Sequence, residues 1–307
     1  MCEILGRIQK LGIIPVVALD NEKQAEPVGR ALCDGGLPCA EVTFRSNAAE
    51  AAIRTMASRF PDMLVGAGTV RTVDQVNRAL DAGARFIVSP GLNPKVVAYC
   101  LAKGLPVFPG VTNPRDIEEA LEFGLDVVKF FPAEASGGIE MIKSLAAPYS
   151  NIRFMPTGGI RACNLNTYLA FPKVIACGGS WMVKPEMIRS GQFNEIQRLT
   201  EEAVKTMLGF ELRCVGIHSQ DGTEAGQAAV YFGKIFEMEH GSCRKNGHIV
   251  IGTNNVERAV SYLVSKDVKM DLSTARYKGG RLSEIYLTKE IGGLAVKLME
   301  KQDGGIE

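Results

Sequence analysis

Residues 106–131 read PVFPGVTNPRDIEEALEFGLDVVKFF and contain the repeating unit that decides the fold. One apolar run begins at Pro106, an amphipathic segment covers residues 114–123, and a second apolar run begins at Asp126. Short apolar runs bounded by turn residues predict buried strands, and the segment between them has the length and period of one helix. The stretch therefore predicts a strand–helix–strand unit with two parallel strands.

The same unit recurs over the first two thirds of the chain. Apolar runs begin near Ile13, Pro38, Leu64, Phe86, Pro106, Asp126, Ile152 and Val174. Amphipathic segments lie between them, for example at 47–60, 73–82, 94–103 and 114–123. Eight evenly spaced runs favour a closed (β/α)8 TIM barrel over an open doubly wound sheet, and no G-x-G-x-x-G follows the first run. We predict an α/β barrel over residues 1–208, with its chemistry at the carboxyl ends of the strands.

The pattern changes after a helical segment predicted at 186–208. From Gly209 the strands are shorter, and a run at 212–218 followed by a helical stretch at 224–232 has a counterpart at 248–252 followed by 256–265. Strand-like runs at 284–290 and 293–300 close this weak repeat. Residues 209–307 are therefore expected to form a second, smaller α+β module.

The composition of the chain limits the binding partners and the cellular location that we expect. Apolar residues make up 46% of the chain, and 35 Lys and Arg balance 34 Asp and Glu, so we expect a compact protein that does not bind nucleic acid. No apolar run reaches the roughly 18 residues that cross a bilayer, and residues 1–10 lack the apolar core of a signal peptide. With eight scattered cysteines and no C-x-x-C, the expectation is a cytoplasmic protein with reduced thiols and no membrane partner.

Histidine usage limits the chemistry. The three histidines are His218, His240 and His248, so residues 1–217 have none. A histidine base or a histidine-rich metal site is thereby excluded from the predicted barrel. Among enzymes that make or break carbon–carbon bonds, this favours a lysine mechanism over a metal-enolate mechanism.

Lys129 is the candidate for that lysine, because it interrupts the apolar strand DVVKFFPAE. Lysine amines are almost wholly protonated in water at neutral pH, and apolar neighbours disfavour the charged form. A neutral amine at Lys129 is a nucleophile toward a ketone. The alternative is a lysine whose charged head extends to solvent at a strand end.

The second predicted strand, CAEVTFRSN, carries an acid and a base. Glu41, Thr43 and Arg45 share one parity and hence one face. A carboxylate near a Schiff-base lysine suits proton transfer, and an arginine suits a substrate carboxylate. The alternative is an ion pair of Glu41 with Lys129 or Arg45 that only fills the barrel.

Small residues follow several strands. The stretches 157–160 (TGGI) and 178–181 (GGSW) follow the last two runs, where barrels commonly bind phosphate through backbone amides. The stretches 66–69 (GAGT) and 89–91 (SPG) follow the third and fourth runs, and Thr69 could supply a hydroxyl donor. Each stretch by itself is more often a tight turn than a site, and it is the placement of the two glycine pairs after the last two strands that favours phosphate binding.

Seven motifs in order carry a family resemblance: E-V-T-x-R at 41–45, G-A-G-T-V at 66–70, S-P-G at 89–91, P-G-V at 109–111, K-F-F-P-A-E at 129–134, P-T-G-G-I at 156–160 and G-G-S-W at 178–181. Through them residues 1–200 resemble the class I 2-keto-3-deoxy-6-phosphogluconate (KDPG) aldolases, which often also act as 4-hydroxy-2-oxoglutarate (KHG) aldolases. The resemblance implies a cytoplasmic homotrimer that needs no metal or organic cofactor.

The resemblance also implies roles for single residues. Lys129 would form the Schiff base and Glu41 would be the general acid and base. The remaining implied contacts are Arg45 and Thr69 to the substrate carboxylate, Pro90 to the pocket wall, and Thr157, Gly158, Gly159, Gly179 and Ser180 to the phosphate end.

Residues 209–307 resemble a vicinal oxygen chelate (glyoxalase-like) module, through CVGI at 214–217, GHIVIG at 247–252 and GGLAVKL at 292–298. Metal-binding members place His or Glu on the first and last of these strands. Here Cys214 and Lys297 stand at those positions, which leaves His248 as the one clear ligand candidate. One histidine does not make a divalent-metal site, so a structural, oligomerisation or regulatory role is favoured over a metal-dependent activity.

The sequence leaves the substrate open. The favoured reaction is cleavage of KDPG to pyruvate and glyceraldehyde 3-phosphate. The alternatives are KHG, the 6-phosphogalactonate epimer, or a catalytically idle sensor of phosphorylated metabolites.

Overall fold

The structure is a computed structural model that describes residues 2–216 and 247–301. The chain divides into two compact units, Met1–Met207 and Leu208–Glu307. Each unit has its own sheet, and each is described by itself below.

The first unit alternates parallel strands with helices. Its strands are β1 (Ile13–Val17), β2 (Cys39–Thr43), β3 (Leu64–Gly68), β4 (Ile87–Val88), β5 (Val107–Phe108), β6 (Gly110–Val111), β7 (Val127–Phe130), β8 (Arg153–Pro156) and β9 (Cys177–Gly179). They form one sheet in the order β5-β4-β3-β2-β1-β9 and another in the order β6-β7-β8. Every pairing between them is parallel. The first unit is therefore a curled parallel sheet of the β/α type. The predicted alternation of parallel strands and helices is confirmed, whereas the strand pairing gives two sheets and not the predicted closed barrel.

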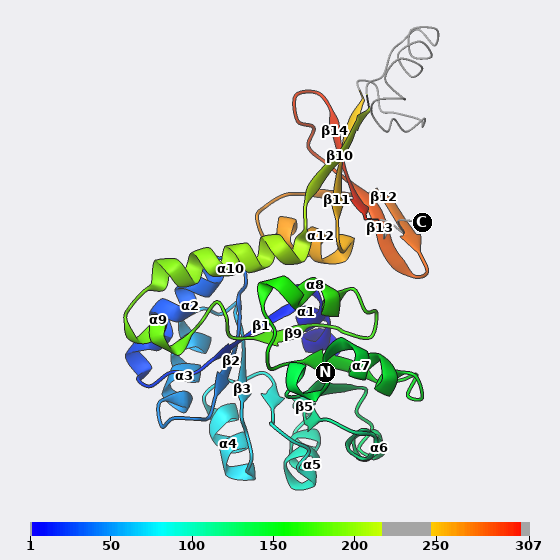
Figure 1. The fold of residues 1–307 in the computed structure, drawn as a ribbon. Coiled ribbons are helices and arrows are strands. Elements are labelled where there is room, and N and C mark those ends of the chain that lie inside the picture. The colour runs from blue at the N-terminus through cyan, green and yellow to red at the C-terminus, as the bar shows by residue number, and fades with distance from the viewer. Residues whose placement is uncertain (1, 217–246, 302–307) are drawn as a thin grey trace, which may run out of the picture. The chain divides into compact units, whose positions relative to one another are not determined.

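Helices connect the strands and cover the outside of this sheet (Figure 1). They are α1 (Cys2–Leu11), α2 (Ala25–Asp34), α3 (Ala49–Arg59), α4 (Val73–Asp81), α5 (Pro94–Ala102), α6 (Pro114–Glu122), α7 (Gly138–Ala146), α8 (Ala162–Leu169), α9 (Pro185–Arg189) and α10 (Phe193–Leu208), with short 3₁₀ turns η1 (Glu22–Gln24) and η2 (Glu134–Ser136). The side chains of Thr72, Asn93 and Asn113 accept backbone hydrogen bonds at the starts of α4, α5 and α6. Local capping thus fixes where three of the helices begin.

One apolar cluster fills the inside of the curled sheet. It combines Ile4 and Ile8 of α1 with side chains near the amino ends of the strands, such as Cys39, Leu64 and Val127. Because the amino ends are packed in this way, the carboxyl ends are the part of the sheet that remains for a site.

Three predicted elements of the first unit differ in detail. The run from Pro106 is divided into β5 and β6 at Pro109, which has no N–H to pair. The run from Val174 forms only an isolated bridge to Phe154, and the strand begins later, at Cys177. The helix predicted at 186–208 is wrong as one element, because Gly191 adopts a φ of +69° between α9 and α10.

The second unit is a five-stranded sheet with one helix among its described residues. Its elements are β10 (Glu211–Gly216), β11 (His248–Thr253), α12 (Val256–Val264), β12 (Met270–Lys278), β13 (Arg281–Leu287) and β14 (Ala295–Glu300). The strand order is β10-β11-β14-β13-β12, with β11 and β14 parallel and the other pairs antiparallel. Helix α12 packs on β13 and β14.

The sequence analysis anticipated this unit in part. Its sheet-rich character and the helix near 256–265 were expected, whereas β12 was missed because MDLSTARYK has few apolar residues and is half exposed. The helical stretch predicted at 224–232, together with His218 and His240, lies outside the described residues. No helix within 2–216 or 247–301 is long and apolar enough to cross a membrane.

Candidate active site

A buried amine and a buried carboxylate meet inside the first unit. Lys129 on β7 donates to Oε1 of Glu41 on β2, with Nζ and Oε1 3.5 Å apart. Lys129 is 5% exposed and Glu41 is 1% exposed, so the pair lies in the interior. The ammonium also lies 4.9 Å from the ring centre of Phe131. The alternative of a lysine that reaches solvent is wrong.

The second oxygen of this carboxylate is open. Within the described residues, Oε2 of Glu41 is buried and has no hydrogen-bond partner. An unpaired buried carboxylate oxygen costs free energy unless a ligand or water pairs with it. A carboxylate in this state can exchange a proton with a group bound beside Lys129, whereas an ion pair that only fills the interior needs no open oxygen.

Two neighbouring strand ends shape the surroundings of the pair. Gly68 at the end of β3 lies against Glu41, since an added Cβ would come within 2.7 Å of the carboxyl carbon. Thr69 follows with a φ of +57°, a left-handed conformation that non-glycine residues rarely adopt. On the other side, the carbonyl of Pro90 lies against Gly110, which pairs with Lys129 across the ladder. Thr69 and Pro90 thus adjoin residues that contact the buried pair.

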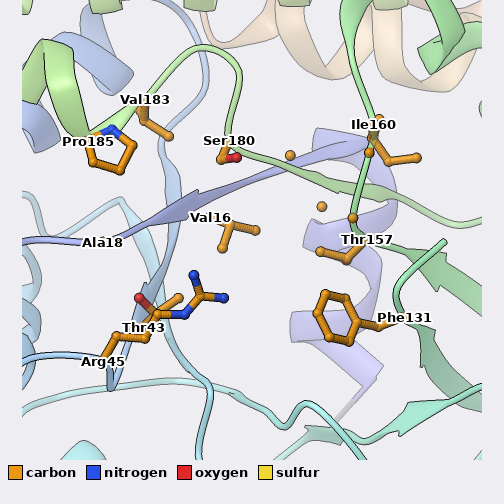
Figure 2. A pocket seen from close by; sticks show the side chains of 14 residues that line it. Val16, Ala18, Thr43, Arg45, Phe131, Thr157, Ile160, Ser180, Val183 and Pro185 are labelled. Carbon is orange, nitrogen blue, oxygen red and sulfur yellow. The ribbon is translucent and has the colours of Figure 1, made fainter. Parts of the chain in front are cut away.

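A cavity of about 160 Å³ opens at the carboxyl ends of the strands (Figure 2). Figure 2 shows the guanidinium of Arg45 pointing into this space, with the ring of Phe131 across from it. Its lining comprises Val16, Ala18, Thr43, Arg45, Phe131, Thr157, Gly158, Gly159, Ile160, Gly178, Gly179, Ser180, Val183 and Pro185.

The structure therefore divides the ten predicted residues into two groups. Arg45, Thr157, Gly158, Gly159, Gly179 and Ser180 line the cavity. Lys129, Glu41, Thr69 and Pro90 are not among the lining residues, and Phe131 connects the two groups because it contacts Lys129 and also lines the cavity.

Arg45 reaches the cavity by a different route from the one expected. Strand β2 ends at Thr43, so the strand parity that joins Glu41 and Thr43 does not extend to Arg45. A turn in which the Arg45 N–H donates to the Thr43 carbonyl, at 2.8 Å, brings the guanidinium in. The Thr43 hydroxyl donates to the carbonyl of Val17 and ties the ends of β1 and β2 together.

Both glycine loops depend on having no side chain. Gly158 and Gly159 have φ angles of +98° and +85°, which favour glycine. A Cβ on Gly179 would collide with the ring of Trp181. Thr157 is buried, and its hydroxyl oxygen has no hydrogen-bond partner within the described residues. These loops expose backbone to the cavity.

Several lining residues were missed at the level of sequence. Phe131 shares strand parity with Lys129, which is a signal that could have found it. Val16 and Ala18 lie at the end of β1, beside β2. Val183 lies in the irregular segment after the second glycine loop and Pro185 begins α9, and no periodicity marks either residue as part of a cavity.

The metal candidates of the second unit do not gather into a site. His248 is 6% exposed and meets the ring of Tyr286 edge to face, with the ring centres 6.5 Å apart. Lys297 is paired with Glu284 at 2.5 Å. Within the part of the chain that the structure describes, no three His, Cys, Asp or Glu side chains are close enough to hold a metal ion.

A curled β/α sheet that buries a lysine amine beside a carboxylate, below a cavity with glycine-rich loops, is the architecture of a carbon–carbon lyase, an aldolase. Comparison with known proteins agrees, since residues 4–199 match the profile of the KDPG and KHG aldolases. The chain belongs to this family.

Individual relatives cover the first unit. The chain is 49% identical over 205 residues to the 2-dehydro-3-deoxy-phosphogluconate aldolase of Treponema pallidum, which is 67% of this chain and 98% of that protein. The KDPG aldolase of Legionella pneumophila, solved with pyruvate captured as a covalent carbinolamine, has a TM-score of 0.63 and 36% identity over 65% of this chain and 97% of its own. The 2-keto-3-deoxy-6-phosphogluconate aldolase of Zymomonas mobilis, solved with 3-phosphoglycerate, has a TM-score of 0.60 and 37% identity over 65% and 94%.

Proposed function

We propose that the protein cleaves KDPG to pyruvate and glyceraldehyde 3-phosphate through a Schiff base on Lys129. The observation that carries this proposal is the buried pair of Lys129 and Glu41, 3.5 Å apart, with one carboxylate oxygen left open. A lysine nucleophile needs a partner that moves protons, and the pair supplies both groups at one point. The names of the relatives support the same reaction.

In the proposed reaction the Lys129 amine adds to the C2 carbonyl, and the C2 oxygen leaves as water with a proton from Glu41, which gives a protonated imine. The Glu41 carboxylate then takes the proton of the C4 hydroxyl while the C3–C4 bond breaks, and the electron pair of that bond moves into the imine to form an enamine. Glyceraldehyde 3-phosphate leaves. Glu41 returns its proton to C3 of the enamine, and hydrolysis of the imine releases pyruvate, restores the amine and gives a proton back to Glu41. Because the imine is the electron sink, the reaction uses no metal or organic cofactor.

The two ends of the substrate would be held by different parts of the site. We assign the carboxylate to Arg45 and Thr69, with Pro90 beside the reacting carbons. The arginine that points into the cavity supports the first assignment.

We assign the phosphate to Thr157, Gly158, Gly159, Gly179 and Ser180. Glycine-rich loops after the last strands of a barrel suit an anion, because their backbone N–H groups are not covered by side chains. The Zymomonas mobilis aldolase was solved with 3-phosphoglycerate, which is a phosphorylated acid of the same kind.

A second substrate is specifically favoured by the family match, which names KHG aldolase. KHG carries a C5 carboxylate in place of the phosphorylated tail, so the same Lys129 and Glu41 would act on it with a distal charge nearer to the reacting carbons. The 6-phosphogalactonate epimer differs from KDPG at one stereocentre and belongs on the same substrate panel. The relatives are named as enzymes, which counts against the hypothesis of a catalytically idle sensor.

Trapping with borohydride tests the mechanism. Incubation of the protein with pyruvate and borohydride should add one pyruvate-derived group, and peptide mapping should find it on Lys129. Glu41→Gln is the control that keeps the amine in place. An unmodified wild-type protein would refute the Schiff-base proposal and would favour the sensor hypothesis.

We also propose that the curled sheet closes as a (β/α)8 barrel over residues 1–208. Two observations support closure. Strands β5 and β6 are separated only by Pro109, and parallel bridges join Phe154 to Val174 and Thr157 to Gly178, between the neighbourhoods of β8 and β9. We further propose a cytoplasmic homotrimer, which the family resemblance implies. Light scattering on the purified protein tests the oligomeric state.

For residues 209–307 we propose a vicinal-oxygen-chelate-like module with a structural, oligomerisation or regulatory role. The strand–helix–strand–strand–strand order from β11 to β14 supports a repeat unit of this kind. Lys297 forms an ion pair with Glu284 and places a positive charge where metal-binding members have an acid. This pair supports a role without metal. Metal analysis of the purified protein tests this, and bound zinc, nickel or manganese near one equivalent would refute it.

A further inference from the structure

A buried tyrosine contacts the back of the first glycine loop, and it has no role in the proposed mechanism. Tyr168 on α8 is 1% exposed, and its hydroxyl donates to Oε1 of Glu134 in η2. Burial, followed by the bond and the charge of Glu134, raises the pKa of this phenol well above its usual range. The hydroxyl is therefore a permanent donor at neutral pH, and Glu134 is the group that accepts from it.

Glu134 in turn lies directly against the loop. Its backbone N–H donates to the carbonyl of Gly158 at 3.0 Å, and the N–H of Ala133 donates to the carbonyl of Thr157 at 2.8 Å. Its side chain occupies the space beside Gly159, where an added Cβ would come within 2.6 Å of the Glu134 Cβ. The carboxylate thus belongs to a segment that is hydrogen-bonded to the loop.

Glu134 is an exposed residue that lies outside the cavity. Gly158 and Gly159 line the cavity, whereas Glu134 and Tyr168 are not among its lining residues. A negative charge is unfavourable next to a site that binds an anion, and its effect increases as it approaches. The Tyr168 hydroxyl fixes this charge outside the cavity.

We propose that Tyr168 is a positioning residue that holds the Glu134 carboxylate behind the glycine loop, and that this contact makes the site selective for phosphorylated over unphosphorylated 2-keto acids. The inference rests on the proposed function, because it assumes that the loop receives the phosphate. Without the hydroxyl, the Glu134 side chain can turn past Gly159 toward the cavity. A phosphate bound there is then repelled, while KHG is affected less, because its distal charge is a single carboxylate that lies closer to the reacting carbons.

Tyr168→Phe tests the proposal, because it removes only the hydroxyl and keeps the buried ring. We expect KM for KDPG to rise about tenfold, which is the size of the Coulomb repulsion between one carboxylate and a doubly charged phosphate about 5 Å apart in a water-like dielectric. We expect kcat for KDPG, and both kcat and KM for KHG, to stay within about twofold of the wild type. Equal losses on both substrates would show a general structural role and would overturn the proposal, as would an unchanged KM for KDPG.

A second substitution separates charge from shape. Adding Glu134→Gln to Tyr168→Phe removes the negative charge at nearly constant size, so KM for KDPG should return to within about twofold of the wild type. A double variant that stays as weak as Tyr168→Phe would overturn the role of charge. If Tyr168→Phe does not fold, Glu134→Gln by itself decides the matter: its KM for KDPG should be equal to or lower than that of the wild type, and a rise would contradict the proposal.

Tyr149→Phe is a matched control within the same unit. Tyr149 also donates its hydroxyl to a glutamate, Glu118, at 3.0 Å, but Glu118 lies on α6 and not on the segment that is hydrogen-bonded to the glycine loop. Its loss should leave both substrates unchanged. The wild-type protein distinguishes the two levels of failure: if it neither traps pyruvate nor cleaves KDPG, the proposed function fails, whereas a competent wild type with unselective variants refutes only this inference.

Discussion

A single methyl group placed on Gly68 should disable catalysis while leaving the fold intact. Gly68 ends β3, and a Cβ there would lie 2.6 Å from Cγ and 2.7 Å from the carboxyl carbon of Glu41. Carbon atoms in contact prefer separations of about 3.5–4.0 Å, so Glu41 has to move by roughly 1 Å in Gly68→Ala. Glu41 is 1% exposed and has Lys129 on its other side, so the movement cannot be absorbed by solvent.

The structure sets the size of both effects. A misplacement of about 1 Å in a reacting group can cost about 10²-fold in rate, so kcat of Gly68→Ala should fall by about that factor. Overpacking of a buried site costs about 1–3 kcal/mol, which the unit can lose without unfolding. Since Lys129 itself is not displaced by the new methyl group, pyruvate and borohydride should still modify it.

Three measurements on one preparation check this prediction: kcat on KDPG, the denaturation midpoint, and the pyruvate adduct by mass. Gly6→Ala on α1 is the control, because an added Cβ there meets nothing within 4 Å. It should retain full activity, and its helix should become more stable by up to about 1 kcal/mol. A Gly68→Ala protein with kcat within twofold of the wild type would refute the reasoning, since β3 would then have moved and Glu41 would not.

Three further predictions follow from the same structure. Lys129→Ala should abolish turnover and trapping, whereas Glu41→Gln should lose turnover but keep trapping; equal loss of trapping in both variants would contradict the separate roles. Burial raises the pKa of the Cys100 thiol to about 12, so peptide mapping after iodoacetamide treatment at pH 8 should find exposed Cys163 labelled before Cys100. The contribution of Cys100 to stability should be full below pH 9 and should be lost as the pH rises toward 12. Early labelling of Cys100 would contradict this prediction. A chain of residues 1–208 should keep the kcat of the full protein, because that span matches 98% of the Treponema pallidum relative; an insoluble or inactive truncation would count against the proposed domain division.

The strand–helix alternation could be predicted because it depends on local sequence. Each apolar run is bounded by residues that stop a strand, and side chains such as Asn113 cap the next helix within the same segment. The break at Gly191 was missed, although the glycine is visible, because a lone glycine inside a helical pattern is often tolerated. Strand β12 was missed for the opposite reason, since it forms through pairing with β13 and not through its own apolar pattern.

The site was predictable to the extent that it follows strand parity. Lys129 and Glu41 stand out because a charged residue in a buried strand needs a partner, and the structure provides that partner 88 residues away. Arg45, which the sequence analysis assigned to the substrate carboxylate, lines the cavity, yet parity gave the wrong reason for its place, because a turn brings it there. The contact of Tyr168 with Glu134 carries no sequence signal, since it joins a helix and a 3₁₀ turn 34 residues apart.

The buried pair and the glycine loop are held by different elements, and this indicates where substrate selectivity can vary within one reaction. Lys129 is held by β7 and Glu41 by β2, and on the proposed mechanism a change at either residue should remove the reaction itself. The glycine loop is held from behind by η2 and α8, and its support can change without displacing the buried pair. An enzyme of this construction can gain or lose preference for a phosphorylated substrate through residues that never touch it, and for this reason Tyr168 and Glu134 are better guides to the substrate than the catalytic residues are.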